Sequence, residues 1–165
     1  MKKLFLMFAI VTIALVSCKK EGSECEFVEP DITATTPEIA HLQNFIAANS
    51  IPATQHPSGL FYVIHEPGAG ARPGICSTVF LKYTGRLMDT NQPFDQNLNG
   101  FSTVVGGLIV GAQKGLQLFN KGGKIDLYIP PTLGYQDRVI RNQTGDTIIP
   151  ANSYLKFEFE LVDVQ

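Results

Sequence analysis

The sequence contains no tryptophan, only three histidines and few charges: Asp, Glu, Lys and Arg make up 17% of its 165 residues. Its formal net charge is −2, and no basic run follows the N-terminal stretch. Proteins that bind nucleic acid gather Lys and Arg on one face, so this balance argues against nucleic acid as a partner. Hydrophobic residues make up 44% of the chain, which suffices for one compact core.

The common catalytic motifs are also missing. The sequence has no G-x-S-x-G elbow, no phosphate-binding loop and no H-E-x-x-H pair. The three histidines, His41, His56 and His65, fall in separate segments without the spacing of metal ligands. We therefore expect neither a metal nor a cofactor.

A long hydrophobic run occurs only at the N-terminus, in MKKLFLMFAIVTIALVSC. Residues 1–17 have the form of a secretory signal peptide, too short for a typical membrane-spanning helix. LVSC at 15–18 resembles the bacterial lipobox, so Cys18 is the expected lipid anchor. An uncleaved membrane anchor is the alternative, and either one places the rest of the chain outside the cytoplasm. Lys19 is not the aspartate associated with inner-membrane retention, which favours the outer membrane.

The compartment decides how the other two cysteines are interpreted. Thiols that face an oxidising space tend to pair, and Cys25 and Cys76 are the remaining candidates for a disulfide. Two free thiols are the alternative, because the sequence does not give their separation in space. Neither cysteine has a C-x-x-C spacing or a neighbouring histidine.

Residues 18–35 are polar and acidic and contain Gly and Pro, so we expect a flexible tether between lipid and domain. A short helix is expected over about 37–48, within an N-terminal unit spanning 36–56. Thr36 is the expected N-cap, with Pro37 at the first helical position, Asn49 at the end and apolar residues at helical spacing: Ile39, Leu42, Phe45 and Ile46.

From residue 57 to 165 the pattern is mainly that of strands. The last of them alternates apolar and charged residues from Leu155 to Leu161, which indicates one buried and one exposed face. Expected strands lie in 59–66, 76–87, 92–95, around 101–105, 124–130 and 154–164. Only one helix interrupts them, expected over about 110–120. This order predicts an α+β fold in which an antiparallel sheet curls around one short helix, with an extra N-terminal helix.

Several motifs occur in a definite order along 59–164. They are Y-T-G at 83–85, F-D at 94–95, I-x-G at 109–111, IPPTLGY at 129–135, and I-I-P followed by L-x-F-x-x-E-L within 148–161. Core packing alone can account for each apolar residue taken singly. Taken in order, the motifs resemble those of the FKBP-type peptidyl-prolyl cis-trans isomerases, and the upstream helix resembles that of lipoprotein members.

The resemblance implies a prolyl isomerase domain over 57–165 with a proline-binding pocket. Its implied walls are Tyr83, Phe94, Phe101, Ile149 and Phe157, with Leu108 and Ile109 at the edge. The Ile109 N–H and the Tyr135 hydroxyl would hold the carbonyls after and before the prolyl ring, and Asp95 would face the imide. Proline-containing polypeptides are the implied substrates, and macrolides the implied inhibitors.

Three departures from the family pattern affect this prediction. Ala112 stands where the family usually places a tryptophan at the pocket floor, so we expect a pocket that is deeper or refilled by a neighbour. Residues 96–100 lack the arginine that often pairs with Asp95, and the loop 136–147, which carries Arg138 and Arg141, is longer than usual. A binding module of the same fold without turnover is therefore the alternative function, and a purely structural lipoprotein a third.

Overall fold

The computed structural model describes residues 25–165. The expected signal peptide and Cys18 lie outside the described residues. Within 25–165, no helix is long and apolar enough to cross a membrane. The elements in chain order are α1 (Thr36–Ala48), β1 (Thr54–Gln55), β2 (Phe61–Glu66), β3 (Thr78–Leu87), β4 (Pro93–Val104), η1 (Val105–Gly107), α2 (Val110–Leu116), β5 (Lys124–Ile129), η2 (Pro131–Leu133), β6 (Ile140–Arg141), β7 (Thr147–Ile149) and β8 (Leu155–Val164).

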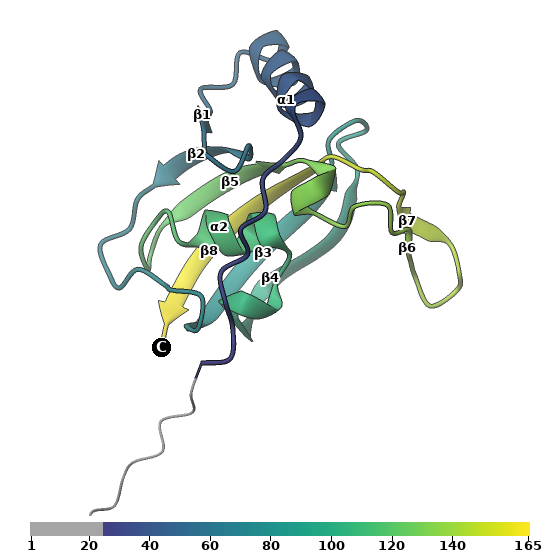
Figure 1. Ribbon diagram of the computed structural model, residues 1–165. Helices are drawn as coiled ribbons and strands as arrows, with labels where there is room; N and C mark the ends of the chain where they lie inside the picture. Colours follow the sequence, from purple (N-terminus) through teal and green to yellow (C-terminus); the bar gives the residue numbers. More distant parts are fainter. Residues whose placement is uncertain (1–24) are drawn as a thin grey trace, which may run out of the picture.

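The main sheet has six strands in the order β1-β2-β5-β8-β3-β4, and every neighbouring pair is antiparallel. Helix α2 lies across one face of this sheet (Figure 1). The predicted α+β fold, a curled antiparallel sheet around one short helix with an added N-terminal helix, is confirmed. The helix is shorter than predicted, because Gln117 is its C-cap and the next residues form turns.

Close contact between α2 and the sheet creates the main core. Leu127 lies directly beneath Gly115, where even a methyl group on the glycine would collide with it. The fully buried side chains of Leu81, Leu116 and Leu161 fill the remaining space between helix and sheet. Burying apolar area of this kind supplies the dominant favourable term in folding.

Helix α1 packs on the opposite face of the sheet, at one end. Its Leu42 and Ile46 join Phe61, Met88 and Tyr128 in a second, smaller core. The N-cap is Thr35 and not Thr36, because the Thr35 side chain accepts from the Glu38 N–H while the Glu38 carboxylate accepts from the Thr35 N–H. This reciprocal capping box fixes the start of the helix one residue early, and Asn49 ends it as predicted.

Residues 25–35, which we call the strap, are not a free tether. A disulfide joins Cys25 to Cys76, with Cα atoms 5.7 Å apart. The strap then crosses α2 (Figure 1), where Lys114 Nζ donates to the Pro30 carbonyl at 2.9 Å. Ala34 ends the strap in the main core. The tether prediction is therefore wrong for these residues, because their few apolar side chains and one disulfide hold them on the domain.

One strand prediction and one loop prediction differ from the structure. The separate strands expected at 92–95 and around 101–105 are one strand, β4, which pairs with β3 through two shifts of register. The loop at 136–147 contains part of a small hairpin, β6–β7, that extends away from the sheet (Figure 1). Its tip is tied by the Asn142 side chain, whose oxygen accepts hydrogen bonds from Thr144 and Asp146.

Candidate functional site

A cavity of about 100 Å³ opens between α2, β3, β4 and β8. Nine of the ten predicted pocket residues line it. The lining residues are Tyr83, Phe94, Asp95, Phe101, Leu108, Ile109, Ala112, Tyr135 and Phe157, together with Phe159. The cavity is much smaller than the clefts of roughly 300–1,000 Å³ that hold drug-sized ligands, so its size suits a single small ring.

Strand register brings the aromatic side chains together. On β3 and β8, Tyr83 lies opposite Phe159 and Gly85 lies opposite Phe157. Directly opposed residues on antiparallel strands share one face of the sheet. Phe101 comes from β4, and the register shifts between β3 and β4 let the adjacent residues Phe94 and Asp95 reach the same cavity.

The glycine of the Y-T-G motif leaves room for two of these rings. A methyl group on Gly85 would lie 2.6 Å from the Phe94 ring and 2.9 Å from the Phe157 ring. Real carbon atoms do not approach so closely, so any other residue would push the rings out of the wall. This requirement explains physically why glycine follows Tyr83 and Thr84.

The rings pack on one another at the spacings expected for aromatic pairs. Phe157 and Phe159 are stacked, with centroids 5.3 Å apart and planes 4° apart. Phe94 meets Phe157 edge to face at 5.5 Å, and Tyr83 meets Phe101 edge to face at 5.4 Å. The result is an apolar wall whose members restrain one another.

One polar pair lies in this wall. The Tyr83 hydroxyl donates to Asp95 Oδ2 at 2.5 Å. Asp95, which we expected to lack the arginine that often pairs with it in the family, is exposed and has the Tyr83 hydroxyl as a donor. Burial and then the hydrogen bond to Asp95 raise the pKa of Tyr83, which keeps its proton in place at neutral pH.

Tyr135 supplies the second phenol. It follows the η2 turn, which begins at Pro131 within the IPPTLGY motif. Burial first, and the charge of Asp95 second, raise the pKa of Tyr135, while the charge of Arg138 lowers it. The net rise keeps the hydroxyl protonated and available as a donor at the cavity.

Ile149 and Phe159 are the two differences between the predicted and observed linings. Ile149 is 2% exposed and belongs to the main core, and it is not among the residues that line the cavity. Phe159 lines the cavity and was missed as a site residue. The alternation along β8 was the signal for it, because Phe159 follows Phe157 by two positions on the same face.

Ala112 and Phe159 both belong to the lining of the cavity. Ala112 lines it and is 1% exposed. Phe159, stacked on Phe157, supplies apolar bulk in the same cavity. The cavity is therefore small even though one of its lining residues is an alanine.

A larger hollow of about 400 Å³ lies on the other face of the sheet, but its character differs. Charged side chains dominate its lining, and they pair with one another, as in Lys82 with Glu160 at 3.1 Å and His65 with Asp126 at 3.3 Å. Within residues 25–165, no group of three His, Cys, Asp or Glu side chains could hold a metal ion. The aromatic cavity is therefore the candidate site.

The fold and cavity define a class of protein: a small α+β domain with an aromatic pocket between its helix and sheet. The sequence profile described as FKBP-type peptidyl-prolyl cis-trans isomerase matches residues 70–162, more than half of the chain. The chain belongs to this family.

Individual relatives agree with this assignment. FkpA of Escherichia coli strain K12, an FKBP-type peptidyl-prolyl cis-trans isomerase, is 38% identical over 110 residues, which are 66% of this chain and 38% of FkpA. The crystal structure of Escherichia coli FkpA superposes with a TM-score of 0.65 at 33% identity, covering 78% of this chain and 60% of that one.

A second solved structure matches over almost its whole length. The peptidyl-prolyl cis-trans isomerase of Pseudomonas syringae pv. tomato gives a TM-score of 0.66 at 27% identity, covering 82% of this chain and 99% of that one. This chain spans 38% of FkpA in the sequence match and 60% in the structural match, so the similarity concerns only part of that relative.

Proposed function

We propose that this protein is a peptidyl-prolyl cis-trans isomerase that assists the folding of exported proteins. The observation that carries the proposal is the cavity, in which four phenylalanine rings meet two protonated phenols and one carboxylate. Substrates are polypeptides that contain proline, and the prolyl ring enters the apolar hollow.

The chemistry needs no nucleophile. Rotation about an X-Pro bond meets a barrier of about 18–20 kcal/mol because the planar amide is stabilised by resonance. Twisting removes that resonance and makes the amide less polar. An apolar wall of Phe94, Phe101 and Phe157 therefore favours the twisted form over the planar, strongly solvated one. Binding the twisted state more tightly than the planar state is what accelerates exchange.

Hydrogen bonds orient the peptide. The Tyr135 hydroxyl binds the carbonyl before the prolyl ring, and the Ile109 N–H binds the carbonyl after it. Ile109 is the N-cap of α2, where N–H groups lack intrahelical acceptors, and no side chain caps this helix. Asp95, held by Tyr83, faces the imide.

A protease-coupled assay on a proline tetrapeptide tests the proposal. Wild-type protein should accelerate cis-to-trans exchange, and Phe157→Leu should lose most of that rate because the ring that faces the proline is gone. Leu98→Ala, at an exposed position outside the cavity, is the matched control. An unchanged rate in Phe157→Leu would refute the site.

One observation favours a second function, a peptide-binding module of the same fold without appreciable turnover. The cavity is lined by Ala112 where the family usually has a tryptophan, and Asp95 pairs with the Tyr83 hydroxyl where the family often has an arginine. Tetrapeptide binding without acceleration at micromolar protein would identify the binder. If neither the peptide nor a pocket-directed macrolide bound, a structural lipoprotein would be the better account.

We also propose that the mature protein is a lipoprotein outside the cytoplasm, anchored through Cys18 in the outer membrane. The lipobox-like LVSC sequence supports the anchor, and the Cys25–Cys76 disulfide fits an oxidising compartment. Mass spectrometry of the mature N-terminus should find an acylated Cys18. Cys18→Ser protein that still fractionates with membranes would contradict the anchor.

A further inference from the structure

The edge of the cavity is formed by a short loop, residues 105–109, which we call the edge loop. It consists of η1 followed by Leu108 and Ile109, and these two residues line the cavity. We propose that Gln113 is a positioning residue that holds the edge loop and thereby aims the Ile109 N–H at a bound peptide. This inference rests on the proposed function, which gives that N–H its role.

Gln113 makes three hydrogen bonds to the loop from inside α2. Its side-chain Nε2 donates to the Leu108 carbonyl at 2.7 Å and to the Gly106 carbonyl at 3.0 Å. Its backbone N–H donates to the Ile109 carbonyl at 3.0 Å. The side chain is 6% exposed, so water competes little for these acceptors. The side-chain bond to the Leu108 carbonyl thus fixes the peptide plane that contains the Ile109 N–H, and the backbone bond to the Ile109 carbonyl fixes the next plane.

Stability alone does not explain why glutamine stands at this position. Its Oε1 is buried without a hydrogen-bond partner, the one such side-chain atom within residues 25–165. An unsatisfied buried acceptor destabilises a fold, and an apolar side chain of equal length would remove it. What glutamine adds is the pair of bonds to the edge loop.

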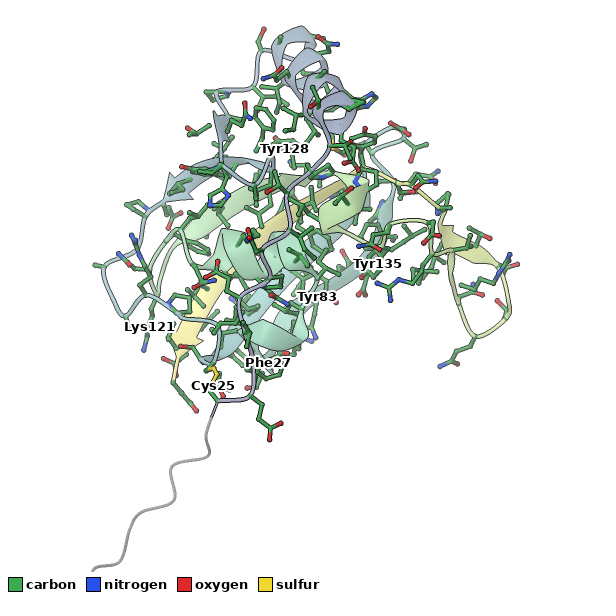
Figure 2. The ribbon with its side chains drawn as sticks, viewed as in Figure 1. Cys25, Phe27, Tyr83, Lys121, Tyr128 and Tyr135 are labelled. Carbon is green, nitrogen blue, oxygen red and sulfur yellow. A yellow bond between two sulfur atoms is a disulfide. The ribbon has the colours of Figure 1, made fainter. Side chains whose placement is uncertain are left out.

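The loop is also held from its other side. The Phe27 ring of the strap packs against Gly106, the residue whose carbonyl accepts from Gln113. Figure 2 shows Phe27 beside Cys25, at the disulfide end of the strap. Because Gly106 lies between these supports, the edge loop is restrained from both directions. A fixed orientation of the binding group is what such restraint supplies to catalysis.

Gln113→Met tests the inference, since methionine keeps the length of the side chain and removes both donors. We expect kcat/KM to fall roughly tenfold, because a small displacement of an orienting group costs one to two orders of magnitude in rate. The amide resonances of Leu108 and Ile109 should move in the peptide-free protein. Gln117→Met is the matched control: Gln117 is the C-cap of the same helix, its side chain donates only to the Gln113 carbonyl, and it does not line the cavity.

The outcomes separate the role of Gln113 from the proposed function. A Gln113→Met protein with wild-type kcat/KM and unmoved amide resonances would overturn the inference. If the wild-type protein showed no turnover, the proposed function would fail. The amide resonances of Leu108 and Ile109 would still test the role of Gln113: a shift in Gln113→Met would support it, and unchanged resonances would overturn it. Should the methionine variant fail to fold, Gln113→Leu, which is smaller and also lacks both donors, replaces it with the same expectations.

Discussion

At the scale of single residues, the cavity depends on how its aromatic side chains share space. Phe159 stacks on Phe157, and Ala112 lines the same cavity as both rings. Ala112 itself is 1% exposed, and the cavity that it lines holds only about 100 Å³, so a much larger side chain here would fill the cavity and press on its neighbours. A small residue at position 112 together with the ring of Phe159 is therefore one way to pack the floor of the cavity.

A substitution at the floor tests this packing directly. Ala112→Trp should lower the free energy of unfolding by about 1–3 kcal/mol, because overpacking a filled core forces side chains out of their rotamers. Urea unfolding measures the loss, and the new indole reports it by fluorescence, since the chain has no other tryptophan. The double variant Ala112→Trp/Phe159→Leu should recover part of the loss. A more stable single variant would show that the floor is not full.

Most of the residues that the resemblance implied for the pocket line the cavity, and their roles in binding proline stay predictions. The resemblance of the ordered motifs to the family led to Tyr83, Phe94 and Phe157, and these three residues line the cavity. The Tyr83–Asp95 hydrogen bond was not foreseen, since nothing in a sequence specifies the rotamers that bring a phenol to a carboxylate. Ile149 was misplaced for the same reason.

At the scale of elements, α1 supports the turn that carries Tyr135. Glu38, in the first turn of α1, accepts from the Thr132 N–H at 2.8 Å and from the Thr132 hydroxyl. Burial by itself raises the pKa of Glu38, but hydrogen bonds from Thr35 and Thr132 outweigh it, so the pKa lies below its ordinary value. The charged carboxylate thus links the helix cap to the η2 turn.

This link predicts how stability depends on pH. Because the folded pKa of Glu38 is lowered, its contribution is complete above the ordinary carboxyl pKa of about 4.3 and is lost as pH falls through the folded value. Glu38→Gln should therefore cost about 1–2 kcal/mol at pH 7 and almost nothing at low pH. Urea unfolding at both pH values measures this, with Asp31→Asn as an exposed control. If Glu38→Gln lowered the free energy of unfolding by the same amount at both pH values, the role assigned to the charged Glu38 carboxylate would be contradicted.

The strap is the element that sequence patterns described least well. Its composition is that of a linker, yet Cys25, Phe27 and Ala34 each hold it on the domain. Sequence reasoning predicted a disulfide but kept two free thiols as the alternative, because pairing depends on a distance in space. Helix α1 and strand β8, whose signals are local and periodic, were by contrast predicted within a few residues.

Removing the disulfide should destabilise the domain. The bond spans 51 residues along the chain, and cross-links of that length stabilise by about 4 kcal/mol in the chain-entropy view, with measured losses of about 2–5 kcal/mol. Reductant should lower the urea midpoint of the protein from residue 19 onward. Cys25→Ser/Cys76→Ser protein should start at the lower midpoint and not respond to reductant. Equal midpoints with and without reductant would show that the strap holds without its covalent link.

At the scale of the whole molecule, separate parts of the fold converge on one small cavity. The sheet supplies its aromatic wall, α2 its floor, and the edge loop and η2 turn its rim. Fold class and family followed from the sequence because strand order and motif order are properties of the chain. The size of the cavity and its internal hydrogen bond required the structure, since both depend on packing among distant residues.

The most direct test of this account is the rate of cis-trans exchange itself, measured by two-dimensional exchange NMR on a proline tetrapeptide with catalytic amounts of the protein. Uncatalysed exchange takes tens to hundreds of seconds. The account predicts exchange cross-peaks at mixing times below about one second with wild-type protein, and their loss with Phe157→Leu. A peptide that binds the cavity while exchanging at the uncatalysed rate would contradict it.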